Sequence, residues 1–177
     1  LGKDGGRTVL ISGCIDTQEV HISSAIASGY KYMLIVTSDE AKARKMCDDA
    51  SFFNKEAIYY PAKDAIFYSA DVHGNQITGE RLRCISRIIN HSSTGEGVLT
   101  VVTTMDGIAD RLIPVERFKE AVITLDYSSE IEPEKLAKKL VAMGFVRTGM
   151  VEDKGQFAIR GGIIDIFSYT DEAPVRI

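Results

Sequence analysis

Residues 156–177 read QFAIRGGIIDIFSYTDEAPVRI, in which apolar and polar residues alternate on both sides of a glycine pair. Alternation with a period of two predicts strands with one buried face. A one-residue bulge at the glycines 161–162 would bring four apolar side chains onto that face. They are Phe157, Ile159, Ile164 and Ile166. Arg160 and Asp165 would then point away from the core, toward solvent.

The last four residues, PVRI at 174–177, predict one more strand. The polar turn before it would return this strand to the side of 163–168, so that Arg176 stands on the same exposed face as Arg160. Sheet arginines are most often simply solvated, but arginine is also enriched at interface hot spots, where its truncation costs about 2 kcal/mol or more. The sequence leaves both interpretations open, and it does not define the register of the strands.

Farther upstream, as far as residue 113, short apolar runs alternate with segments of helical periodicity. Four strands are predicted, at residues 7–13, 31–38, 57–61 and 98–104. Helices are predicted at 17–28, at 77–91 and at 105–112. One more helix is predicted to begin after 31–38, with Ser38 or Asp39 as its cap. The helix at 17–28 is expected to bury Val20, Ile22, Ala25 and Ile26. This order of elements predicts an α/β fold with a parallel sheet covered on both faces.

The pattern changes after Pro114. The next elements predicted are a strand at 121–126, a helix at 132–144 and strands at 145–151 and 156–167. The connections between these strands are short enough to favour antiparallel pairing. A partial α+β unit with antiparallel strands is therefore expected to follow the parallel-sheet unit, and we divide the chain into 1–115 and 116–177.

Gly13 lies between the first predicted strand and the first predicted helix, where nucleotide-binding proteins hold phosphate. A P-loop has the pattern G-x-x-x-x-G-K-[ST], whose lysine neutralises phosphate charge and whose hydroxyl binds Mg²⁺. In this sequence the second glycine is replaced by Gln18, the lysine by Glu19 and the hydroxyl residue by Val20. A carboxylate repels a triphosphate, and valine cannot bind a metal. The residues therefore favour a plain strand-to-helix turn over a nucleotide site.

The composition is that of an ordinary globular chain, with 177 residues of which 45% are hydrophobic and 26% charged. The net charge of −4 gives no indication of nucleic-acid binding. Widely spaced cysteines suggest a reducing cytosol, and no apolar run has the length of a membrane helix. The histidines share no ligand spacing, so neither a metal site nor a catalytic group is expected. Because the sequence lacks an initial methionine and stops in a predicted strand, we expect a piece of a longer protein.

Three stretches resemble a known family. The stretch GQFAIRGGIIDIFSYTDEAPVRI (155–177) is similar to a signature that bacterial transcription-repair coupling factors share with the excision-repair helicase UvrB. YYPAKDAIFYSADVHGNQITGERLRCISRII (59–89) and TVVTTMDGIADRLIP (100–114) resemble further elements of the coupling factors. UvrB has an intact P-loop and a long β-hairpin insertion, where this sequence has a degenerate loop and only the short segment 62–76. The resemblance is therefore to the coupling factors.

The resemblance implies a degenerate RecA-like domain, called 1a, at residues 1–115 and the start of domain 2 at 116–177. In the family, domain 1a no longer uses ATP. No cofactor is therefore expected for this chain, and ATP and Mg²⁺ would serve a motor elsewhere in the full-length protein. The resemblance thus implies a non-catalytic scaffold in the bacterial cytoplasm.

Domain 2 of the family binds UvrA, the damage-sensing protein of excision repair, and its contact arginines match Arg160 and Arg176 here. The resemblance further implies that the full-length protein binds RNA polymerase and translocates on double-stranded DNA. It also implies that a C-terminal domain masks the UvrA surface, and it implies no membrane partner.

Two other classes of function stay open at this point. A UvrB-like, ATP-dependent helicase subunit that binds damaged DNA would need a nucleotide at residues 13–20, where the loop is degenerate. A DNA-binding module would use the basic residues within 77–91 and 135–139, but acidic residues are interleaved with them, so a solvated helix face is the better interpretation.

Overall fold

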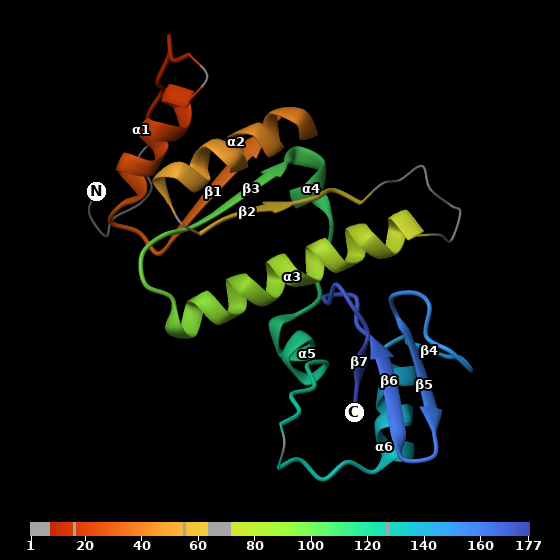
Figure 1. Cartoon of the computed structure of the whole chain (residues 1–177). Coiled ribbons are helices and arrows are strands. Elements are labelled where there is room, and N and C mark those ends of the chain that lie inside the picture. Colours follow the sequence, from red (N-terminus) through yellow and green to blue (C-terminus); the bar gives the residue numbers. More distant parts are fainter. Residues whose placement is uncertain (1–7, 16, 55, 64–71, 127) are drawn as a thin grey trace.

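The computed structural model describes residues 8–15, 17–54, 56–63, 72–126 and 128–177. Its elements form two sheets, one of three strands and one of four, each packed against helices (Figure 1). In the described part of the chain, no helix is long and apolar enough to cross a membrane.

The three-stranded sheet contains β1 (Tyr32–Thr37), β2 (Ala57–Tyr60) and β3 (Leu99–Thr104) in the order β1-β3-β2. All pairs are parallel, with β3 in the centre. The predicted parallel sheet is therefore confirmed for three of its four predicted strands. Parallel strands need crossover connections, which the helices between them supply.

Helices cover both faces of this sheet. The first face carries α1 (Thr17–Ala27) and α2 (Glu40–Phe53), and α3 (Val72–Thr94) packs on the opposite face. The cap predicted for α2 is confirmed at Asp39, whose Oδ1 accepts a hydrogen bond of 2.8 Å from the Lys42 amide. Helix α3 begins earlier than predicted, and residues 64–71 of the predicted polar loop lie outside the described residues.

Two small cores follow from this layering. The core under α1 and α2 consists of Val20, Ala43, Met46, Ala50 and Val102. The core under α3 consists of Ile58, Tyr60, Cys84 and Leu99. Successive side chains of β2 and β3 point to opposite faces of the sheet, so each strand contributes to both cores, as a sheet buried on both sides requires.

The strand predicted at 7–13 is wrong for its described residues. Residues 8–13 form no strand, and the Leu10 side chain is 93% exposed. An apolar run becomes a strand only where a neighbouring strand pairs with its backbone. Residues 8–13 pair with no strand of the described sheet, so their apolar pattern predicts a strand that does not form.

The buried faces also differ from the prediction in two places. In α1 the buried residues besides Val20 are Ser24 and Ala27, while Ile26 is exposed, so the helix is rotated relative to the predicted face. In β1, which a sheet covered on both faces would bury, Leu34 is 60% exposed. The reason is that α3 packs over β2 and central β3 and leaves this side of the edge strand open.

Short helices connect the two sheets. They are α4 (Met105–Ala109) and α5 (Val115–Glu120). The Thr104 hydroxyl accepts a hydrogen bond from the Gly107 amide and caps α4. The predicted strand at 121–126 is wrong, because these residues pair with neither sheet.

The four-stranded sheet has the order β4-β5-β6-β7. Its elements are β4 (Val146–Arg147), β5 (Gln156–Arg160), β6 (Ile163–Phe167) and β7 (Val175–Arg176). The antiparallel prediction is confirmed for the pair β6–β7. The single strand predicted at 156–167 is wrong, because β5 and β6 are two strands that pair antiparallel. The antiparallel prediction is wrong for β4, which pairs with β5 in parallel. Residues 148–155 carry the chain back to the start of β5 and so make the crossover that a parallel pair needs.

Helix α6 (Pro133–Ala142) packs on one face of this sheet, as predicted for 132–144. Its proline lies in the first turn, where the missing amide hydrogen costs nothing. The core between helix and sheet consists of Leu136, Ala137, Leu140, Phe145, Phe157 and Ile164. Because this face is filled, the opposite face of β5, β6 and β7 is the one that is free to present polar side chains.

Candidate functional site

The hairpin of β5 and β6 determines which side chains share a face. Arg160 pairs with Ile163, so only the two glycines 161–162 form the turn, and every pair before it is in unbroken register. Gly161 has φ +63°, which glycine adopts without the strain of other residues. The predicted one-residue bulge is therefore wrong, and a tight two-residue turn stands in its place.

The predicted faces are nevertheless confirmed, because directly opposed residues of a sheet point to the same side. Phe157 pairs with Ile166, and Ile159 with Ile164. These four side chains form the face toward α6 or border its core.

The opposite face gathers three charged side chains from three neighbouring strands. Asp165 in β6 pairs with Ala158 in β5 and with Arg176 in β7. Arg160 lies diagonally across from Asp165 on β5. Cross-strand diagonal neighbours are within reach of long side chains, so both guanidinium groups meet the single carboxylate. We call these residues, Arg160, Asp165 and Arg176, the Arg–Asp–Arg cluster.

Both arginines donate hydrogen bonds to Asp165. Arg176 binds side-on, with Nε 2.6 Å from Oδ1 and Nη2 3.0 Å from Oδ2. Arg160 donates from Nη2 to Oδ2 at 2.5 Å. Charge-assisted bidentate pairs of this kind fix the plane of the guanidinium as well as its position.

The carboxylate is the buried member of the cluster. The side chain of Asp165 is 11% exposed, while those of Arg160 and Arg176 are 51% and 65% exposed. Hydrogen bonds from Arg176 and then from Arg160 lower the pKa of Asp165 to about 2. The cluster therefore carries two positive charges and one negative charge at neutral pH and presents its positive members to solvent.

A shallow depression of about 280 Å³ adjoins the cluster. Its walls are completed by Met150, Val151 and Pro174. Met150 and Pro174 are exposed. Arginine and methionine, which both line this depression, are enriched at protein–protein interfaces.

The sequence placed Arg160 and Arg176 on one exposed face, and the structure brings them together there. The sequence did not predict the role of Asp165. This side chain was expected to point into solvent, and it lies instead beneath both arginines. The alternation already placed Asp165 on the face of Arg160. Only the register of β6 against β7, which the sequence does not define, joins it to Arg176.

The residues compared above with a P-loop have structural roles in the described chain. Gly13 has φ +80° in a bend, and Gln18 in the first turn of α1 accepts a hydrogen bond from the Ile15 amide. Glu19 forms an ion pair of 3.2 Å with Lys42, and Val20 is fully buried in the core under α1. The valine that stands at the position of the P-loop hydroxyl is thus part of the core.

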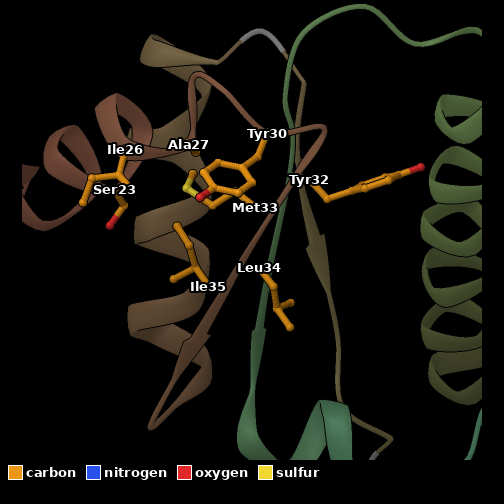
Figure 2. Close-up of a pocket in the computed structure, with 8 residues that line it drawn as sticks. All are labelled: Ser23, Ile26, Ala27, Tyr30, Tyr32, Met33, Leu34 and Ile35. Atoms are coloured by element: carbon orange, nitrogen blue, oxygen red, sulfur yellow. The ribbon is translucent and has the colours of Figure 1, made fainter. Parts of the chain in front are cut away.

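A second depression, of about 290 Å³, lies between α1 and β1. Figure 2 shows the ring of Tyr30 over Met33, with Leu34 and Tyr32 pointing to the other side of the strand. The Ser23 hydroxyl on its wall donates to the Glu19 carbonyl within α1. The lining is mainly apolar, and we find no group in it suited to catalysis.

Metal-ligating and nucleophilic groups do not gather elsewhere in the described ranges. Among them there is no cluster of three or more histidine, cysteine, aspartate or glutamate side chains. Cys84 is in the core under α3, where burial raises the pKa of its thiol to about 11 and its S–H group donates to the Tyr59 carbonyl. A thiol with a raised pKa is inert at neutral pH.

Comparison with known proteins finds relatives of the chain and of its C-terminal part. Residues 123–177 match the family described as the UvrB interaction domain. Over 98% of its length, the chain is 33% identical to the transcription-repair-coupling factor of Bacillus subtilis (strain 168). Over the same share it is 30% identical to the transcription-repair-coupling factors of Staphylococcus aureus (strain USA300) and Staphylococcus haemolyticus (strain JCSC1435). The chain spans only 14–15% of the length of these relatives.

Proposed function

We propose that this chain is a docking module for the repair protein UvrA. Residues 123–177 match the UvrB interaction domain family, and nearly the whole chain is similar to transcription-repair-coupling factors. The docking surface is the Arg–Asp–Arg cluster, and Arg160 and Arg176 pair with acidic side chains of UvrA. The cluster lies entirely within the residues that match the domain family.

The observation that carries this proposal is the exposure of two guanidinium groups on one face of the sheet. Arginine presents a planar fork of N–H donors that matches a carboxylate. Arg160 and Arg176 are each more than half exposed, and Asp165 uses only part of their donors. Such a surface gives electrostatic complementarity, which favours specificity and rapid association.

The first part of the chain has a different role in the proposal. Residues 1–115 form a RecA-like scaffold without a working phosphate loop, and residues 116–177 form the docking unit. The buried Val20 and the Glu19–Lys42 ion pair support this division of labour, because they occupy positions that a nucleotide site would need. The chain itself is therefore non-catalytic.

In the whole protein, the same module would bring UvrA to RNA polymerase stalled at DNA damage in the bacterial cytoplasm. An ATP-dependent motor in other segments would move along double-stranded DNA, using ATP and Mg²⁺. A C-terminal domain would cover the docking surface until it is needed. The homology to transcription-repair-coupling factors supports this assignment.

The proposal is tested by capture of purified UvrA on the immobilised chain. We expect the double variant Arg160→Ala with Arg176→Ala to lose at least tenfold in affinity, because hot-spot arginines contribute about 2 kcal/mol or more. Arg147→Ala is the matched control, since this exposed arginine of the same sheet pairs with Phe157 and belongs to the other face. Undiminished capture by the folded double variant would reject the proposed surface.

A further inference from the structure

We propose that Asp165 is a positioning residue, whose carboxylate holds Arg160 and Arg176 side by side so that their remaining N–H donors face a carboxylate of the docking partner. This inference rests on the proposed docking function and names the group that prepares the surface for it. It also states the chemistry that the surface recognises, which is an acidic side chain bound by two arginines at once.

The hydrogen bonds show which donors are left for a partner. Arg176 uses Nε and Nη2 on Asp165, so its Nη1 group does not contact the carboxylate. Arg160 uses Nη2, so its Nε and Nη1 groups do not. Because a guanidinium is rigid and planar, fixing one edge of it also fixes the direction of the other edge.

The burial of Asp165 agrees with this role. Its side chain is 11% exposed and lies under two arginines that are each more than half exposed. A partner therefore meets the guanidinium groups and not the carboxylate. Asp165 also separates two like charges on nearby strands, which would otherwise repel each other and spread apart.

Positioning lowers the cost of binding. A long arginine side chain loses rotamer freedom when a partner immobilises it, and that loss weakens the complex. In this chain Arg160 and Arg176 have already lost this rotamer freedom in the free state, because both are held on Asp165. The same reasoning explains why affinity often increases when a binding surface is rigid beforehand.

The charge of Asp165 has the opposite effect on an acidic partner, and this separates two possible roles. If Asp165 only competed with the partner for the arginines, its neutralisation would strengthen docking, because the cluster would gain one unit of positive charge. If Asp165 positions the arginines, its neutralisation weakens docking in spite of that gain. The sign of the change in affinity therefore distinguishes positioning from competition.

The experiment measures UvrA affinity for the 177-residue chain and for Asp165→Asn, which keeps the size of the side chain and removes its charge. We expect about tenfold weaker binding in Asp165→Asn, from the lost ordering of two side chains. In the background of Arg160→Ala with Arg176→Ala, the same substitution should have no further effect, because Asp165 acts only through the arginines.

A second readout observes the Arg176 side chain directly, and its decisive measurement uses the unaltered free chain. The Nε–Hε group of Arg176 should give an ordered NMR signal in the free chain, with slow hydrogen exchange, and should remain ordered when UvrA binds. In Asp165→Asn the same signal should become mobile while thermal unfolding confirms that the chain is folded. A mobile Arg176 Nε–Hε group in the unaltered chain would overturn the inference, even if Asp165→Asn does not fold.

The outcomes separate this inference from the proposed function. Suppose that folded Asp165→Asn binds UvrA unchanged or more tightly, while the double arginine variant loses binding. This result overturns the positioning role of Asp165 and still supports the docking surface. Unchanged binding by the double arginine variant overturns the docking surface itself.

Discussion

Gly79 of α3 lies so close to Tyr169 that a Cβ atom built on the glycine would be 2.1 Å from the Tyr169 carbonyl oxygen. Tyr169 follows β6, and its ring packs edge-on against Phe145 with 5.5 Å between the ring centres. The contact therefore joins the long helix of the three-stranded sheet to the turn that follows β6. The absence of a side chain at residue 79 is what allows this approach.

Gly79→Ala should destabilise the chain even though alanine is the better helix former. Helix propensity alone would stabilise the variant by about 1 kcal/mol. The neighbouring atom is backbone and cannot turn aside, and overpacking of this kind costs about 1–3 kcal/mol. We expect a net loss of about 1 kcal/mol in urea unfolding. Gly149→Ala is the matched control because no atom lies within 4 Å of its added Cβ, and a stability gain in Gly79→Ala would contradict the contact.

Asp165 should make stability depend on pH in the acid range. Hydrogen bonds from Arg176 and Arg160 lower its pKa to about 2 from a usual value of 3.8. Between these values the unfolded chain binds a proton that the folded chain does not, so the stabilisation is complete above pH 3.8 and is lost as the pH falls toward 2. The difference in unfolding free energy between the unaltered chain and Asp165→Asn should shrink over this interval. A difference that stays constant from pH 6 to pH 2 would show that Asp165 is not paired.

Phe157→Ala should open a cavity in the core under the four-stranded sheet. Phe157 is fully buried between the sheet and α6, and truncation of a buried phenylalanine costs about 3–5 kcal/mol. Urea unfolding measures the loss. Val146→Ala in the same sheet is the control, because Val146 is exposed and should change stability by about 0.5 kcal/mol or less. Equal effects of the two substitutions would refute the location of this core.

Arg81 should not be replaceable by lysine. Its buried guanidinium donates to the Pro61 carbonyl at 2.7 Å, lies 3.1 Å from Asp110 and stacks on the ring of Tyr60. Lysine keeps the charge but cannot make these contacts together. We expect Arg81→Lys to lower the free energy of unfolding by about 2 kcal/mol. Breaking a fully buried ion pair costs about 3–5 kcal/mol, and the loss is smaller here because Asp110 is partly exposed.

The control for Arg81 lies on the same helix. Arg87 is exposed, so Arg87→Lys should leave thermal unfolding nearly unchanged. If both substitutions have the same small effect, the contacts of Arg81 do not contribute to stability.

ATP should not bind to residues 13–20. Glu19 adds a negative charge, and Val20 is buried where a P-loop has its metal-binding hydroxyl. Equilibrium dialysis with ATP and Mg²⁺ should show no saturable binding at micromolar concentrations. Micromolar binding by this chain would favour the UvrB-like enzyme over the docking module.

The sequence predicted those elements well whose physical cause lies within a few neighbouring residues. Alternation along 156–167 follows from the pleat of a strand, so the face containing Phe157 and Ile164 was correctly predicted. Asp39 was predicted as a cap because its short side chain satisfies a free amide at the start of α2. Both causes act within a few residues and need no distant partner.

Pairing between strands was predicted less well, for a physical reason. The apolar runs at 7–13 and 121–126 have the composition of strands, but a strand also needs a partner for its backbone groups. The parallel pairing of β4 depends on the path of 148–155, which no local pattern describes. Distant packing thus decided which apolar runs became strands.

The sequence by itself determined the parallel α/β arrangement of the first sheet, the helix predicted at 132–144 and the shared face of Arg160 and Asp165. These follow from periodicity, which is a property of neighbouring residues. Only the tertiary structure placed Asp165 beneath both arginines, because that arrangement depends on the register of β6 against β7. A shift of one residue would turn Arg176 to the other face, so the register is what converts three charged residues into one surface.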